Sequence, residues 1–181
     1  YRQGEIDRAI RTLQPLVESG DEEARRMARD LRAAETHFRQ ASTLQEAGRY
    51  AEALEEWDVF LDRDRRLTGG RKGVRFEAAS GSLATIYYLR GKGAFDQGDL
   101  PRASRFWTMA GRIDPESEEV RKGLKQLARS AQRVFREGYS LQSINPKMAV
   151  EKWEEVLEIV PSSDPYYQKA KQQIERHSVI P

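Results

Sequence analysis

Apolar residues recur at steps of three and four along most of this chain, a spacing that predicts amphipathic helices. No segment keeps the two-residue alternation of a half-buried strand, so we expect an all-α fold. The pattern is clearest between residues 84 and 115, where two helical stripes flank a glycine turn. The stripes consist of Tyr87, Gly91 and Ala94, and of Ala103, Trp107, Ala110 and Ile113.

Turn residues divide this stretch into the two arms of a helical hairpin. Gly98 ends the first arm, and Asp99 can cap the second through its carboxylate. Pro101 fits a first helical turn because its missing N–H would be unpaired there, and Pro115 prevents simple continuation. The sequence therefore predicts two antiparallel helices, with Gly98 and Asp99 at the turn between them and Pro115 after the second.

The residues before this hairpin predict further helices. One helix begins near Ile6 and should bend or end near Pro15, and a long helix should cover residues 21–47, which contain no proline or glycine. After Gly48 a second arm carries apolar residues at helical spacing, and the glycine-rich segment 69–73 predicts a loop. Helix is expected to resume from Val74.

The residues after the hairpin repeat the pattern. A single long helix is expected over residues 116–144, with Asp114 as its candidate cap. The pair Asn145-Pro146 should break that helix and begin a shorter arm. A final helix from Asp164-Pro165 to about His177 should cover the apolar end of the preceding hairpin.

The stretch from Tyr87 to Pro115 resembles the tetratricopeptide repeat, a hairpin unit of about 34 residues with fixed large, small and aromatic positions. Arg90 departs from the leucine that is usual before the first glycine. The matching residues are Tyr87, Gly91, Gly98, Ala103, Trp107, Ala110 and Pro115.

This resemblance implies a right-handed α-solenoid of antiparallel helical hairpins with lengthened helices and a C-terminal capping helix. The glycines Gly48 and Gly98 are 50 positions apart, so the third unit is expected to carry an insertion. The expected division is a single domain made of a truncated repeat at 1–20, repeats at 21–66, 67–115 and 116–161, and a capping helix and tail at 162–181.

Composition and chemistry point away from catalysis. The chain has no cysteine, only two distant histidines, and a formal net charge of +2. The glycine-rich segment lacks the spacing of a phosphate-binding loop. We therefore predict no catalytic residues, no metal site, no cofactor, no small-molecule substrate and no enzymatic activity. The longest uncharged run, residues 78–89, is too short for a bilayer helix, so we expect a cytoplasmic protein, with the periplasm as the alternative.

The family resemblance implies a concave groove that holds a peptide or helix of a protein partner. The same aromatic residues could instead pack between the long helices, and the sequence leaves both readings open. The resemblance further suggests a scaffold in a bacterial multiprotein machine for secretion, motility or signalling, as part of a larger chain or complex. The candidate partner-binding residues are Phe38, Tyr88, Lys92, Phe95 and Tyr139.

A run of basic residues supplies an alternative function. It could dock the chain electrostatically onto nucleic acid or anionic lipid. A solvated loop is the preferred interpretation, because no aromatic residues are interleaved with the cations. The run consists of Arg63, Arg65, Arg66, Arg71, Lys72 and Arg75.

Overall fold

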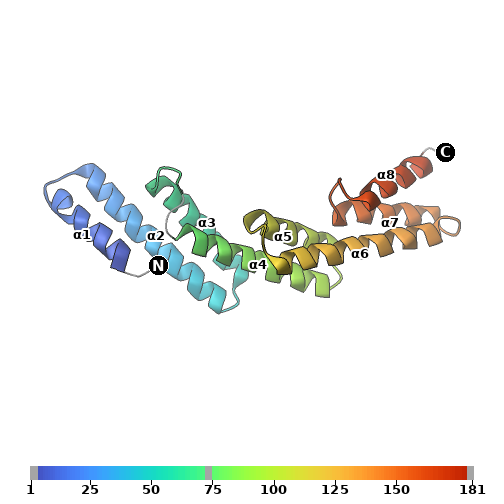
Figure 1. The fold of residues 1–181 in the computed structure, drawn as a ribbon, viewed down its shortest axis with the longest axis horizontal. Coiled ribbons are helices and arrows are strands. Elements are labelled where there is room, and N and C mark those ends of the chain that lie inside the picture. Colours follow the sequence, from blue (N-terminus) through green and yellow to red (C-terminus); the bar gives the residue numbers. More distant parts are fainter. Residues whose placement is uncertain (1–3, 72–74, 179–181) are drawn as a thin grey trace. The chain divides into compact units, whose positions relative to one another are not determined.

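The computed structural model describes residues 4–71 and 75–178, and all regular structure within these ranges is α-helical. The prediction of an all-α fold is confirmed for this part of the chain. The chain divides into two compact units, Tyr1–Ile86 and Tyr87–Pro181, and helix α4 (Phe76–Asp96) runs through the boundary. Figure 1 shows the order of the helices.

The first unit is built around the long helix α2 (Glu22–Glu46), which contacts both α1 (Gly4–Glu18) and α3 (Tyr50–Leu67). Asp21 begins α2, because its Oδ1 accepts hydrogen bonds from the backbone N–H groups of Glu23 and Ala24, both at 2.9 Å. Aromatic rings from α2 and α3 form the centre of the unit. Phe38 meets Trp57 edge-on at 5.0 Å and Phe60 at 5.2 Å between ring centroids.

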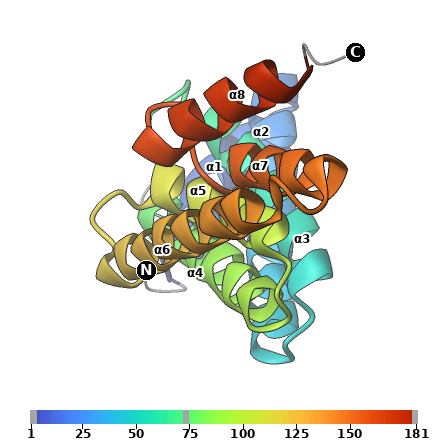
Figure 2. The ribbon, with the colours of Figure 1, turned by 90° about the vertical axis from the view of Figure 1, so that its right-hand side faces the viewer.

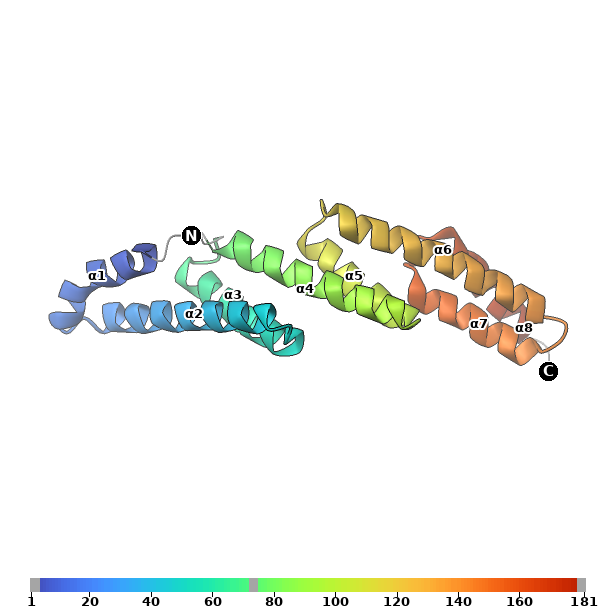
Figure 3. The same cartoon turned by 90° about the horizontal axis from the view of Figure 1, so that it is seen from below.

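The second unit continues with α5 (Leu100–Ile113), α6 (Glu118–Leu141), α7 (Pro146–Ile159) and α8 (Pro165–Ser178). Helices α6 and α7 run side by side, as Figure 3 shows. Helix α8 packs against both of them (Figure 2). Its Ala170 is fully buried, and Tyr166, Tyr167 and Ile174 pack onto the core. Helix α8 therefore buries one face against α6 and α7.

Two tryptophans of the second unit lie directly on glycine backbone. A Cβ atom at Gly91 would stand 2.4 Å from Cδ1 of Trp107, and a Cβ atom at Gly123 would stand 2.8 Å from Cδ2 of the same indole. The indole is therefore held between α4 and α6. Likewise, a Cβ atom at Gly138 would stand 2.5 Å from Nε1 of Trp153. Each of these glycines therefore permits a close approach between helices that a larger residue would prevent.

Close approach lets each indole donate a hydrogen bond to main chain. Trp107 Nε1 donates to the carbonyl oxygen of Tyr88 at 3.0 Å, and Trp153 Nε1 donates to that of Phe135 at 3.2 Å. In both cases the carbonyl lies three residues before the contacting glycine. Trp57 differs, because its Nε1 donates to the side-chain oxygen of Gln45 at 3.2 Å. In α2, Ala41 stands where the other two helices have Gly91 and Gly138. We attribute the different hydrogen-bond partner of Trp57 to the Cβ atom of Ala41, which glycine lacks.

Several expected helix boundaries change in the structure. Helix α6 begins with Ser117, whose hydroxyl accepts the N–H of Val120 at 3.4 Å, so Asp114 is not its cap. The Oδ1 of Asp114 instead accepts the N–H of Glu116 in the preceding turn at 3.2 Å. Helix α6 also ends at Leu141 rather than at residue 144. Helix α1, by contrast, ends at Glu18, three residues after Pro15 and thus near the expected position.

Other boundaries follow the sequence prediction. Asp99 caps α5 by accepting the N–H of Arg102 at 3.0 Å, and Asn145 caps α7 by accepting the N–H of Met148 at 3.1 Å. Gly98 has a φ of 81°, which a residue with a side chain rarely adopts. The part of the expected glycine-rich loop at residues 72–74 lies outside the described residues.

Candidate functional site

The residues predicted to bind a partner fall in both units and are described unit by unit. Phe38 belongs to the first unit, where its ring contacts two aromatic side chains of α3 and the guanidinium of Arg75, 4.3 Å from the ring centroid. Its ring therefore has structural neighbours on several sides. This placement corresponds to the packing interpretation of the sequence.

The α4 residues of the predicted groove differ in how they are engaged. Tyr88 stacks on Trp107 with 6.3 Å between centroids, and Phe95 lies 5.4 Å from the same indole. Lys92 is exposed and donates a hydrogen bond to Asp96 at 2.9 Å. That bond and the charge of Asp96 raise the pKa of the Lys92 ammonium group. Both rings therefore pack on Trp107, which corresponds to the packing interpretation of the sequence.

Tyr139 on α6 combines an exposed ring with a fixed hydroxyl. About half of the residue, 48%, is exposed. Its ring meets Phe135 at 5.3 Å and Trp153 at 5.9 Å between centroids, and its hydroxyl accepts a hydrogen bond from Gln173 at 3.0 Å. The side chain therefore links α6, α7 and α8 and leaves one face open.

The predicted basic run does not form one exposed surface. Arg75 is 5% exposed, so its inclusion in a basic patch was wrong. Its burial is compensated by a carboxylate and an aromatic ring from α2. Arg63 pairs with Asp30 at 3.3 Å, Arg66 pairs with Asp62, and both arginines belong to α3 rather than to a loop. Arg65 and Arg71 are exposed, and Lys72 lies outside the described residues.

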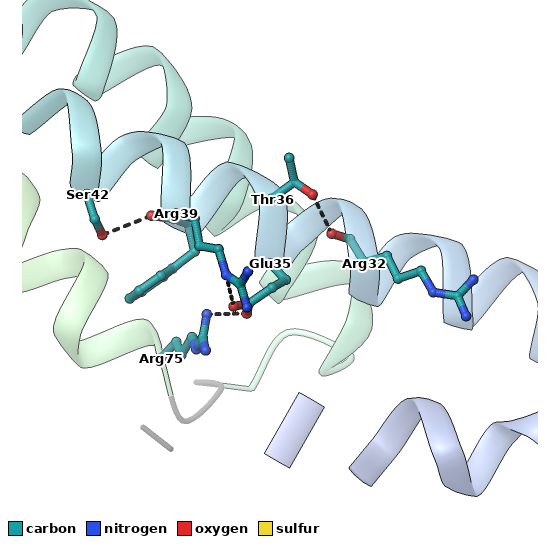
Figure 4. A network of polar contacts seen from close by, with 7 residues as sticks. Arg32, Glu35, Thr36, Arg39, Ser42 and Arg75 are labelled. Carbon is teal, nitrogen blue, oxygen red and sulfur yellow. Dashed lines mark hydrogen bonds and ion pairs between the residues drawn. The ribbon is translucent and has the colours of Figure 1, made fainter. Parts of the chain in front are cut away.

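Figure 4 shows how Arg75 is held. Its guanidinium and that of Arg39 converge on the carboxylate of Glu35, which the Nε of Arg39 reaches at 2.8 Å. The Glu35 side chain is only 15% exposed. Two cations therefore neutralise one nearly buried carboxylate, and the guanidinium of Arg32 points away from this cluster. The cluster joins the start of α4 to α2.

A groove in the second unit is the strongest candidate for a binding surface. It has a volume of about 540 Å³ and lies between α5, the first half of α6 and the loop that joins α7 to α8. Five apolar residues line it, and we call them its floor: Val120, Leu124, Ala128, Val160 and Pro161. We call this surface the α5–α6 groove.

The walls of the α5–α6 groove are fixed by contacts within the unit. Ser104 of α5 donates its hydroxyl to the carbonyl oxygen of Ile159 at 2.7 Å, which ties α5 to the end of α7. At Gly111 an added Cβ atom would lie 3.4 Å from Val120, so α5 and α6 are already in close contact there. Contacts within the second unit therefore hold both walls of the groove in place.

The rim of the α5–α6 groove is polar and more strongly cationic than anionic. Arg112, Arg121 and Lys125 border it, together with Asp114 and Asp164. Both aspartates already accept hydrogen bonds from nearby backbone N–H groups. Asp164 Oδ1 accepts the N–H of Tyr166 at 2.7 Å, and Asp114 Oδ1 accepts that of Glu116. Lys125 is exposed and has no ion pair among the described residues. The rim thus offers cations around an apolar floor.

Neither histidine of the chain lines the α5–α6 groove. The described residues contain no group of three or more histidine, aspartate or glutamate side chains arranged to hold a metal ion. His37 Nδ1 contacts Glu56 at 2.6 Å, and the His177 ring lies 5.0 Å from that of Trp153. Among the described helices, none is long and apolar enough to cross a membrane.

Sequence reasoning did not identify the α5–α6 groove. Its residues come from three separate segments, and only the fold brings these together. The signal that could have indicated it is the pair of proline-containing turns at Pro115 and Pro161, each of which follows the end of a short helix. No family model matches the chain, and no curated protein or solved structure is significantly similar to it.

Proposed function

We propose that this chain is a non-enzymatic protein-interaction module whose α5–α6 groove holds an apolar, acidic segment of a protein partner. The observation that carries the proposal is the groove itself, about 540 Å³ in volume, with an apolar floor and a rim that includes three basic side chains. Apolar partner side chains would bury surface on that floor. Carboxylates on the partner would meet the rim cations.

The charge of α6 supports an acidic partner. Beyond the groove its exposed surface continues with Arg129, Arg133 and Arg136, while Glu137 is the only carboxylate in that half of the helix. Complementary charge raises the association rate and discriminates between partners more than it adds affinity. A partner of the same composition but opposite charge should therefore be rejected.

The proposal includes a repeat arrangement of the tetratricopeptide type. The pairs Ala41 and Trp57, and Gly91 and Trp107, are both 16 positions apart, and Gly138 and Trp153 are 15 apart. In each pair a small residue of one helix precedes a buried tryptophan of the next. A recurring arrangement of small and large residues is what stacked hairpins require. Such arrays present extended surfaces to peptides and helices.

A designed probe peptide tests the proposal. The probe is a helical peptide with leucines at every third or fourth position and glutamates between them, and its control carries lysine in place of glutamate. We expect the acidic probe to bind the full chain more tightly than the basic one in fluorescence anisotropy. The double variant Arg121→Glu with Lys125→Glu should weaken binding of the acidic probe by about tenfold or more.

A matched variant distinguishes the effect of the groove residues on binding from the effect of overall charge. The changes Arg105→Glu and Lys147→Glu remove the same charge from exposed positions of the second unit that do not line the groove. They should leave binding of the acidic probe within about twofold of wild type. Equal binding of the acidic and basic probes, or equal losses in the two double variants, would refute the groove as the docking surface.

A further inference from the structure

A second pocket lies in the first unit, between α1 and α2, and is lined by facing stripes of the two helices. Residues 6, 7, 10 and 11 come from α1, and residues 32, 35, 36 and 39 come from α2. Both sets follow the three-and-four spacing of a single helix face. The volume of this α1–α2 pocket is about 500 Å³.

Three arginines line the α1–α2 pocket: Arg11 from α1, and Arg32 and Arg39 from α2. Arg39 uses its Nε for Glu35, so its two terminal nitrogens are not needed for that bond. Among the described residues, neither Arg11 nor Arg32 makes an ion pair. In Figure 4 the Arg32 guanidinium points away from Glu35.

The carboxylates of the pocket do not balance these cations. Glu35 is already neutralised by the buried Arg75, which approaches it from outside the pocket lining. Asp7 is then the one carboxylate left to offset the three lining arginines. The pocket therefore keeps an excess of about two positive charges. That excess is opposite in sign and similar in magnitude to the charge of a phosphate monoester near neutral pH, about −1.5 to −2.

We infer that the α1–α2 pocket binds a phosphate monoester dianion. Guanidinium groups suit this ligand, because their planar N–H donors pair bidentately with phosphate oxygens. Ile6 and Ile10 provide an apolar surface beside the arginines, so the group that carries the phosphate finds an apolar contact. This site lies in a different unit from the α5–α6 groove and does not depend on its function.

Calorimetric titration of the full chain at pH 7.5 and low salt tests the inference with three probes. Phenyl phosphate should bind saturably, and phenyl sulfate, a monoanion of similar shape, should bind more weakly. Inorganic phosphate distinguishes the sources of the ligand. Binding equal to that of phenyl phosphate indicates free phosphate, and weaker binding indicates a phosphate carried on a larger molecule.

Two double variants locate the site. Arg11→Gln with Arg32→Gln should weaken phenyl phosphate binding by about tenfold or more, the effect of losing at least one charge-assisted hydrogen bond. Arg8→Gln with Arg29→Gln removes the same charge from the same two helices outside the pocket lining and should change binding less than about twofold. All four arginine side chains belong to exposed residues, and thermal melts of both variants should match wild type.

The inference fails if phenyl phosphate shows no saturable binding at concentrations up to about 10 mM, a range that covers weak sites. It also fails if phenyl sulfate binds as well as phenyl phosphate, or if the two double variants lose affinity equally. Loss of acidic-peptide binding in the α5–α6 groove variants would leave the result at this pocket unchanged.

Discussion

Two glycines of α4, two residues apart, should respond in opposite ways to the same substitution. At Gly93 an added Cβ atom has no neighbour within 4 Å, so Gly93→Ala should stabilise the protein by about 0.5–1 kcal/mol through helix propensity. At Gly91 the same Cβ atom would stand 2.4 Å from Cδ1 and 2.5 Å from Nε1 of Trp107. Gly91→Ala should therefore destabilise the protein.

The magnitude follows from the surroundings of the Trp107 indole. The ring cannot retreat, because Gly123 of α6 closes its other side. Overpacking of this kind costs about 1–3 kcal/mol, and the indole hydrogen bond to Tyr88 contributes about 1 kcal/mol more. After subtracting the gain of about 1 kcal/mol in helix propensity, we expect a net loss of about 1–3 kcal/mol.

Urea unfolding of both variants measures the difference. Because the chain has two compact units, circular dichroism and tryptophan fluorescence should be followed together to detect separate transitions. Gly91→Ala should lower the midpoint of the transition that reports on the second unit, and Gly93→Ala should raise it slightly. If Gly91→Ala stabilises the protein as much as Gly93→Ala does, the close contact between glycine and indole is refuted.

Three further predictions concern single sites. Trp107→Ala should destabilise by about 3–5 kcal/mol in urea unfolding, because the residue is 2% exposed, and a loss below about 1 kcal/mol would contradict its burial. Arg75→Ala should destabilise by about 2–3 kcal/mol, because Glu35 keeps Arg39 but loses its buried partner, and an unchanged melting temperature would show the pair to be dispensable. Tyr88→Ala combined with Lys92→Glu should lower the melting temperature through lost stacking on Trp107, whereas Lys92→Glu alone should leave it nearly unchanged. Equal melting temperatures of the two variants would contradict a packing role for Tyr88.

Local sequence signals account for most of the helices. Caps such as Asp99 and Asn145 act within three residues, so their effect can be predicted without knowing the fold. The start of α6 shows where this fails. Asp114 and Ser117 are both suitable caps, and the choice between them depends on how the chain leaves α5. The sequence alone could not distinguish them.

The candidate sites depend on contacts that are distant in sequence. Arg75 follows a glycine-rich segment and carries a charge, which together indicate solvent exposure. Its burial depends on Glu35, 40 positions earlier, and on the ring of Phe38. The α5–α6 groove likewise requires residues from α5, α6 and the turn after α7. Helical periodicity gives the buried face of each helix, but it does not give the space between helices.

The two glycines of α6 limit how this helix can move. Gly123 and Gly138 touch the indoles of Trp107 and Trp153, which lie on different helices. Fifteen residues separate them, so the contacts are about 22 Å apart along the axis and about 60° apart around it. Rotation of α6 about its axis would drive backbone into one indole or the other. The helix is therefore fixed against rolling, and the basic residues at the rim of the groove keep a constant direction whether or not a partner is bound.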